Sequence, residues 1–395
     1  MVYPAILIAS VFLLLAFAVE RLSPRVGLPS VIVLVGLGLL AKPLLAMVGY
    51  RLQGLDVIVP IVGAVGLILI VLEGALDIEI RRDRLRLAGA ALVQAVAGFL
   101  LCAAVLAGLV TLVLPLTPVQ ALVLAVPFAV ISSAVAIPSS RFLPPAGREF
   151  VIYESSISDI LGVLVFFALL NSDGTLSGVL YGLVGGSMLS LVLAVVCAVG
   201  LVLVLMRVEG HIRFVPLLAG LFGLYAAGKL MHLSPLIMVL FLGLLLNNPR
   251  FITRLPGLRG AMDASYDATL SEFKVLVQEL TFAVRGFFFI LLGYWTDLSD
   301  LASLRAWTGA VLVLAVVYGG RRLLLRFSGQ EAVSSLQWLA PRGLITVLLF
   351  LEARQVLNLP GYINGVVVIV VLASTALVTV ARVRAATPVT PASAS

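Results

Sequence analysis

The chain has 395 residues, of which 62% are hydrophobic and 11% are charged, and its mean hydropathy is +1.20. Soluble domains carry about 25% charged residues, so this composition excludes an ordinary globular protein and indicates a chain that lies in lipid. Apolar runs close to the ~20 residues that cross a bilayer recur as far as residue 384, and only loops separate them. We therefore expect residues 1–384 to form one transmembrane domain.

Thirteen apolar segments predict an all-α polytopic protein with about 13 transmembrane helices. The expected spans are residues 3–19, 30–49, 56–76, 87–114, 119–138, 149–171, 176–206, 212–231, 233–248, 271–295, 302–327, 332–354 and 361–384. The first segment lacks a basic leader and a small-residue cleavage site, so we expect a retained span rather than a signal peptide. Cys102 and Cys197 lie inside apolar runs, which favours buried side chains over a disulfide or a metal framework.

The distribution of basic residues predicts the orientation. The formal net charge is +7, but the 26 lysines and arginines are scattered between spans, which argues against a nucleic-acid partner. With the N-terminus outside, eighteen of the 26 fall in cytoplasmic connections, five in outer connections and three within spans. The positive-inside rule therefore predicts a multi-pass protein of the inner (plasma) membrane, with the N-terminus outside and the C-terminus in the cytoplasm.

Two of the expected spans are interrupted near their middles. In the span 119–138, Ser132 and Ser133 precede Pro138, and the span 332–354 contains Pro341-Arg342-Gly343. Paired broken helices are typical of inverted-repeat transporters that bind their substrate near the bilayer midplane.

Two polar segments stand outside this pattern. Residues 247–271 contain prolines and charged residues, and we expect a cytoplasmic linker there that splits the domain into halves. Residues 385–395 are expected to form a disordered cytoplasmic tail.

The strongest candidate site is the sequence Tyr-Glu-Ser-Ser-Ile-Ser-Asp, which ends at Asp159 and opens an otherwise uncharged apolar run. An ionisable group at the centre of a membrane helix costs about 2.5 to 3.5 kcal/mol, so each one needs a reason. Helical spacing puts Ser155 and Asp159 on one face and Glu154 and Ser158 on the neighbouring face. Carboxylate and hydroxyl oxygens suit a hard monovalent cation. The alternative is that Glu154 caps or pairs at a helix entrance and Asp159 only forms a buried hydrogen bond.

Other spans supply candidate partners for this cluster. Glu73, Arg285 and Arg342 each lie within an apolar run. Because a buried arginine keeps its proton and needs a fixed anion, we expect Arg342 to pair with Glu154. Unwinding at Ser132 and Ser133 would free backbone carbonyls to coordinate an ion.

These motifs resemble the monovalent cation:proton antiporter superfamily, particularly its bacterial and archaeal sodium/proton exchanger branch (NhaP-like, CPA1-type). Four strings carry the resemblance in the family's order along nearly the whole chain: LILIVLEGALDIEIRRDRLR, ESSISDILGVLVF, FFFILLGYWTDL and APRGLITVLLFLE. The resemblance implies inverted repeats with two broken crossing helices. It also implies a homodimer in which a six-helix core moves against a dimerisation domain.

The resemblance also assigns roles to single residues. Asp159 matches the essential aspartate, Glu154 and Ser155 match its neighbouring ligands, and Glu73 matches a ligand linked through water. Arg342 matches the arginine paired with Glu154, and Ser132 matches the threonine whose carbonyl helps to bind the ion.

The chain departs from the family pattern at two positions. Ser158 stands where the family usually has Asn or Asp before the essential aspartate, and Ser132-Ser133-Ala134 replaces the usual Thr-Asp-Pro of the first broken helix. Ser133 thereby lacks the carboxylate that normally neutralises helix ends at the crossing.

Together these features predict a secondary active antiporter that exchanges Na⁺ or K⁺ for H⁺, with both ions competing for Asp159. One titrating carboxylate at positions 158–159 favours a one-for-one electroneutral cycle. No cofactor is expected beyond the transported ions. The alternatives are an organic-solute transporter on the same scaffold, a cation channel, and an intramembrane enzyme that uses Glu154 and Asp159; the absence of an HExxH motif argues against the enzyme.

Overall fold

The computed structural model describes residues 2–26, 29–47, 49, 55–78, 85–170, 172, 178, 192–200, 214–231, 235–248, 264–327 and 336–386. Within these ranges the regular structure is entirely helical. Eight stretches there are long and apolar enough to cross a membrane, and two further helices are shorter and apolar. The all-α prediction is confirmed.

Most helices match an expected span. Long helices are α1 (Val2–Val26), α2 (Ser30–Met47), α3 (Leu55–Asp77), α4 (Leu85–Val113), α7 (Pro145–Leu170), α12 (Ala264–Trp295), α14 (Leu304–Phe327) and α16 (Tyr362–Ala386). Shorter ones are α5 (Pro118–Ala129), α6 (Ser133–Ser139), α10 (Phe214–Leu230), α11 (Pro235–Asn247), α13 (Leu298–Ala302) and α15 (Leu344–Val356), with 3₁₀ turns η2 (Ser140–Phe142) and η5 (Leu336–Trp338). However, α1 ends seven residues later and α12 begins seven residues earlier than predicted, and α15 covers only the second part of the expected span 332–354. Most of the expected span 176–206 lies outside the described residues, although 192–200 is helical.

The expected linker 247–271 is shorter than predicted. Residues 249–263 lie outside the described ranges, but α12 already begins at Ala264, so Ser271 is helical. Buried Tyr266, Leu270, Phe273 and Val277 recur at helical spacing and continue the apolar face of α12 toward its N-terminus. Of the expected tail, the first two residues end α16, and residues 387–395 lie outside the described part.

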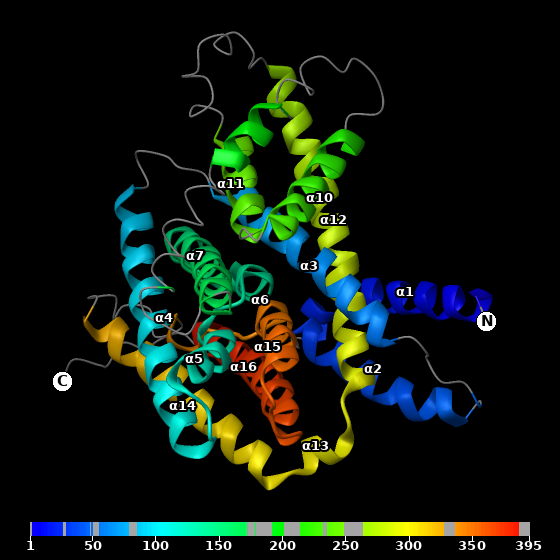
Figure 1. The fold of residues 1–395 in the computed structure, drawn as a ribbon, viewed down its shortest axis with the longest axis vertical. Helices are drawn as coiled ribbons and strands as arrows, with labels where there is room; N and C mark the ends of the chain where they lie inside the picture. The colour runs from blue at the N-terminus through cyan, green and yellow to red at the C-terminus, as the bar shows by residue number, and fades with distance from the viewer. Residues whose placement is uncertain are drawn as a thin grey trace, which may run out of the picture.

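The helices pack as two bundles (Figure 1). In the first bundle, α12 packs against α1, α2 and α3, and α11 packs against α3 and α10. In the second bundle, α4 packs against α5, α7 and α14, α6 packs against α7, and α16 packs against α14. Each bundle draws helices from both the N-terminal and the C-terminal parts of the chain.

Close backbone contacts hold the first bundle together. A Cβ atom on Gly38 of α2 would lie 2.0 Å from the carbonyl oxygen of Ile290, and one on Gly293 of α12 would lie 2.1 Å from the carbonyl oxygen of Val35. Small residues let membrane helices approach this closely, so dispersion contacts accumulate along the crossing. The pair α2–α12 therefore forms a tightly packed unit.

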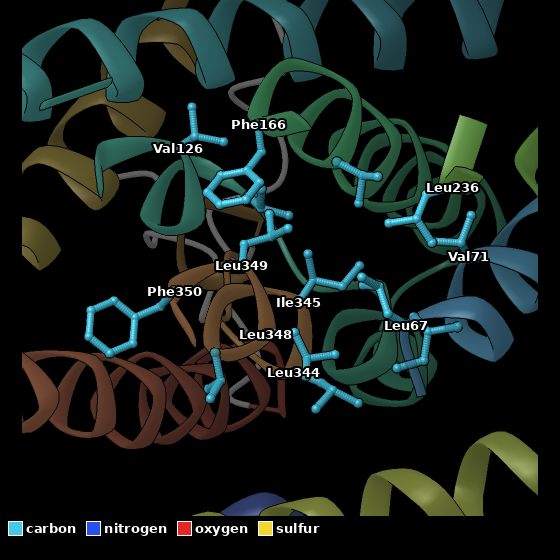
Figure 2. Close-up of a cluster of buried hydrophobic side chains, with 14 of the residues drawn as sticks. Leu67, Val71, Val126, Phe166, Leu236, Leu344, Ile345, Leu348, Leu349 and Phe350 are labelled. Carbon is cyan, nitrogen blue, oxygen red and sulfur yellow. The ribbon is translucent and has the colours of Figure 1, made fainter. Parts of the chain in front are cut away.

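The seam between the bundles is apolar where α15 meets α3. Figure 2 shows Leu344, Ile345 and Leu348 of α15 in the same buried cluster as Leu67 and Val71 of α3. At Gly63 of α3 the approach is also close, because an added Cβ would lie 2.9 Å from a methyl carbon of Leu348. No directional bond between these side chains fixes one register of the two helices.

Both predicted breaks are confirmed. Helix α5 ends at Ala129 and α6 begins at Ser133, while residues 339–343 are extended between η5 and α15. The two breaks cross each other, since the backbone N–H of Ser132 donates to the carbonyl oxygen of Pro341 at 3.0 Å. Gly343 is required at this crossing because a Cβ there would lie 2.4 Å from the Ser132 hydroxyl oxygen.

Candidate ion-binding site

Helix α7 holds the first break with two consecutive side chains. The Ser158 hydroxyl accepts the backbone N–H of Ile131 at 2.9 Å, and Asp159 Oδ2 accepts the backbone N–H of Ser133 at 3.1 Å. Unwound backbone in an apolar interior needs such partners, because no water is present to satisfy its N–H groups. Residues 158 and 159 thus replace helical hydrogen bonds that the break removes.

Gly162 lets the break approach α7. A Cβ on Gly162 would lie 2.1 Å from Cγ2 of Val130, so any larger residue would push the unwound segment away from Ser158 and Asp159. Gly162 also lies one turn beyond Ser158, on the same face of the helix as the hydroxyl that binds the N–H of Ile131.

Two oxygen atoms at the break have no hydrogen-bond partner. Asp159 is 7% exposed and Ser132 is 1% exposed, and both Asp159 Oδ1 and the Ser132 hydroxyl are left unsatisfied. Buried polar atoms of this kind are costly, so an unsatisfied pair beside a helix break indicates room for a ligand.

The Ser132 carbonyl is arranged differently from the prediction. It accepts the N–H groups of Val135 at 3.3 Å and Ala136 at 2.9 Å, because it opens the hydrogen-bond ladder of α6. The expectation that unwinding frees this carbonyl is therefore wrong, and the atom of Ser132 that remains without a partner is its hydroxyl oxygen.

Ser155 lies one turn before Asp159 and is 1% exposed. Its hydroxyl donates to the Val151 carbonyl oxygen at 2.7 Å. This bond uses the hydroxyl proton and leaves the lone pairs of the oxygen as acceptors. Ser155 can therefore offer an oxygen toward a cation without breaking a hydrogen bond.

Glu154 pairs with Arg321 rather than with Arg342, so the predicted pairing is wrong. Arg321 Nη1 and Nη2 donate to the two Glu154 carboxylate oxygens at 2.6 Å and 2.8 Å, and Arg321 Nε donates to the Leu336 carbonyl at 2.7 Å. The Glu154 side chain is 2% exposed and the Arg321 side chain is 5% exposed. This fork-to-fork geometry satisfies both charges inside the second bundle.

Arg321 lies near the end of the expected span 302–327 and was counted among the eighteen basic residues of the cytoplasmic connections. In the structure it lies within α14, which continues to Phe327. The signal that identifies it is the apolar sequence Leu323-Leu324-Leu325, which follows the two arginines and extends the helix past them.

Arg342 instead satisfies the end of the interrupted helix α5. Its Nε donates to the Phe128 carbonyl at 2.6 Å and its Nη1 donates to the Ala340 carbonyl at 3.0 Å, and the residue is 1% exposed. The last carbonyls of a helix lack partners and carry the negative end of its dipole, so a guanidinium group there is favourable. Arg342 is anchored through its own N–H, which donates to the Ser374 hydroxyl.

A small cavity lies on the Glu154 side of α7. Its volume is about 20 Å³, which accommodates one water molecule, and it is lined by Glu154, Ser158, Arg321 and Arg342 among others. Glu154 and Ser158 therefore share one face of α7, as their spacing predicts. Asp159 is not among the residues that line this cavity, so the two carboxylates of α7 do not share it.

Arg285 connects the two bundles. It lies on α12, and its Nη1 donates to the Ala134 carbonyl of α6 at 3.2 Å. Pro138 lacks an N–H and cannot donate to Ala134, so Arg285 supplies the missing bond. Half-buried Glu73 of α3 lies within the electrostatic field of Arg285.

Two larger cavities mark opposite ends of the molecule. One, of about 640 Å³, is lined by residues near the end of α1, the start of α2, along α6, in the middle of α12 and near the end of α16. The other, of about 170 Å³, is lined by residues at the ends of α12 and α15 and the start of α16.

The sequence matches the family described as "Sodium/hydrogen exchanger, transmembrane" over residues 8–385. The chain belongs to this family. Its activity is accordingly cation:proton antiport, and the exchanger is a multi-pass membrane protein. The family and the solved relatives are transporters and not enzymes.

Solved structures show the same fold. The exchanger is similar to the sodium proton antiporter MjNhaP1 from Methanocaldococcus jannaschii at pH 8, with 21% identity, a TM-score of 0.73, and coverage of 96% of this chain and 100% of that one. A structure of the same antiporter from an electron-microscopy map gives 20% identity, a TM-score of 0.71, and coverage of 98% and 96%. A comparison with curated proteins finds no match.

Proposed function

We propose that Asp159 is the site at which a monovalent cation, Na⁺ or K⁺, and a proton compete in this exchanger. The observation that carries the proposal is the unsatisfied Oδ1 of Asp159, which lies in the buried side of a helix break while Oδ2 is held by Ser133. A proton or a dehydrated cation on Oδ1 satisfies this carboxylate, and each excludes the other. Competition for one oxygen atom gives exchange.

The other ligands are proposed from oxygens within reach of the break. The Ser132 hydroxyl has no partner, Ser155 keeps its lone pairs, and half-buried Glu73 of the first bundle interacts electrostatically with Arg285, which donates to the carbonyl of Ala134. This set contains oxygen atoms only, which suits a hard monovalent cation. Glu154 acts as the partner of Arg321 and supports the site from the neighbouring face of α7.

We propose a one-for-one electroneutral cycle. Ser158 carries no charge, and both oxygens of Glu154 are bound by the guanidinium fork of Arg321. Asp159 is then the group of α7 that changes protonation during the cycle. Binding one cation in place of one proton leaves the charge of the site unchanged.

The two bundles supply the moving parts of the proposed cycle. The second bundle carries the broken helices and Asp159, and its seam with α3 is apolar. We propose that it moves along this seam to expose the site to each side of the membrane in turn. We further propose a homodimer in the inner (plasma) membrane, with residues 1–384 as one domain, an outer N-terminus and a cytoplasmic C-terminus.

Proton-gradient collapse in proteoliposomes tests the role of Asp159. The variant Asp159→Asn keeps the shape of the side chain and removes its titration, so addition of Na⁺ or K⁺ is expected to release no protons above the level of empty vesicles. The matched control is Asp267→Asn, which changes an exposed carboxylate of α12 and is expected to exchange at the wild-type rate. An Asp159→Asn protein that exchanges cation for protons at the wild-type rate would refute the proposal.

A further inference from the structure

The large cavity of about 640 Å³, here called the vestibule, carries a charge that does not suit a cation pathway. Its ionisable lining residues are Arg21, Arg141, Arg285, Arg382 and Glu20. The lining therefore contains four arginines and one glutamate. In the part of the chain that the structure describes, none of the four arginines forms an ion pair with a carboxylate.

The vestibule reaches the ion-binding site. Ala134 and Val135 line it, and they directly follow Ser133, whose N–H is bound by Asp159. A cation that enters by this route meets a net positive wall before it meets the carboxylate. Charges along a low-dielectric cleft act strongly on an approaching ion, so this wall lowers the local cation concentration.

The start of α2 adds to the positive field. Pro29, Ser30 and Val31 line the vestibule, so the N-terminal turn of this 18-residue helix, the positive end of its dipole, lies there. Phe282, Phe289 and other apolar side chains line the same space. The cavity thus combines guanidinium groups with an apolar wall.

We propose that the vestibule binds a phosphate group, and that an anionic phospholipid supplies it. Guanidinium forks bind phosphate oxygens in pairs, and basic pockets between membrane helices accept lipid headgroups. Inorganic phosphate fills only a small part of the volume, whereas a headgroup with its glycerol backbone also covers Phe282 and Phe289. The bound anion neutralises the arginines and restores access of the cation to Asp159.

Lipid binding to the purified full-length protein tests this proposal independently of transport. Native mass spectrometry with phosphatidylglycerol and with phosphatidylcholine measures how much lipid each protein retains. The double variant Arg141→Gln/Arg382→Gln removes two exposed vestibule arginines and is expected to weaken retention of phosphatidylglycerol by up to about 30-fold. The control Arg148→Gln/Arg326→Gln removes two exposed arginines outside the vestibule and is expected to retain the lipid as the wild type does.

A second arm identifies the source of the phosphate. Inorganic phosphate, compared with potassium chloride at equal ionic strength, is added to the same proteins in a thermal-shift assay. Stabilisation by inorganic phosphate that disappears in the vestibule variant supports the phosphate chemistry with a soluble source, and retention of phosphatidylglycerol alone supports the lipid source. The proposal is overturned if the vestibule variant retains phosphatidylglycerol as the control does and shows the same response to inorganic phosphate.

Transport adds a distinctive readout. In phosphatidylcholine vesicles the vestibule variant is expected to show a lower KM for the cation than the wild type, because two repelling charges are gone. Addition of phosphatidylglycerol is expected to lower the KM of the wild type and of the control, but not that of the vestibule variant. The same change of KM in all three proteins on addition of phosphatidylglycerol would contradict the proposal. Loss of exchange in a protein that still retains phosphatidylglycerol would count against the role proposed for Asp159 and not against lipid binding in the vestibule.

Discussion

The pairing of Glu154 with Arg321 gives the sharpest test of the site geometry. Replacing Arg321 by Met removes two hydrogen bonds, of 2.6 Å and 2.8 Å, to a carboxylate that is 2% exposed. A hydrogen bond to a charged group contributes about 1.5–3 kcal/mol, so the pair accounts for roughly 3–6 kcal/mol. Breaking a buried ion pair from one side costs about 3–5 kcal/mol, which agrees with this figure.

The double variant Glu154→Gln/Arg321→Met removes both charges and is expected to recover most of the lost stability. The assay is thermal unfolding in detergent, followed by size-exclusion chromatography of the surviving protein. A double-mutant cycle between residues 154 and 321 is expected to show a coupling of several kcal/mol, since both side chains belong to one network.

The same cycle with Arg342→Met separates the two possible pairings. Arg342 donates to the Phe128 and Ala340 carbonyls, so its loss is expected to destabilise the protein by an amount that does not depend on residue 154. Strong coupling between residues 154 and 342, together with none between 154 and 321, would refute the reasoning.

Two further predictions concern the break and the first bundle. Ser158→Asp adds a second carboxylate beside Asp159, and its exchange rate is expected to depend on a potassium-diffusion potential set by valinomycin. The control Ser158→Asn is expected to exchange at a rate that does not depend on this potential. An active Ser158→Asp protein whose exchange rate is independent of the potential would contradict the electroneutral proposal. Gly293→Val places a Cβ 2.1 Å from the Val35 carbonyl and is expected to lower stability by about 1–3 kcal/mol or more in thermal unfolding. Gly319→Val, in open space on α14, is its control, and equal loss in both variants would show that the α2–α12 contact is not the cause.

The breaks were predictable because local chemistry dictates them. Ser132 and Ser133 stand where the first break ends, and the second break contains Pro341, which cannot donate a backbone hydrogen bond, followed by Gly343. The cost of an ionisable group in lipid likewise singles out Asp159 from the sequence. These inferences need only a residue and its near neighbours.

Partners that lie far apart in the sequence could not be predicted in this way. Arg321 and Arg342 are both arginines in the C-terminal part of the chain, and either of them suits a buried glutamate. Only the packing of α14 against α4, beside α7, and the crossing of the two breaks decide that Arg321 reaches Glu154. Arg342 is directed to the end of α5 by the same crossing.

The sequence by itself determined that this chain spans a membrane many times, where its helices break, and which carboxylate is the strongest candidate for the ion site. The tertiary structure decided which atoms remain free: Asp159 Oδ1 and the Ser132 hydroxyl, with Ser158 and Asp159 Oδ2 used to hold the unwound backbone. The physical reason is that hydrophobicity and backbone breaks are properties of a short segment. Hydrogen bonding at a crossing depends on atoms from helices that the sequence does not place side by side.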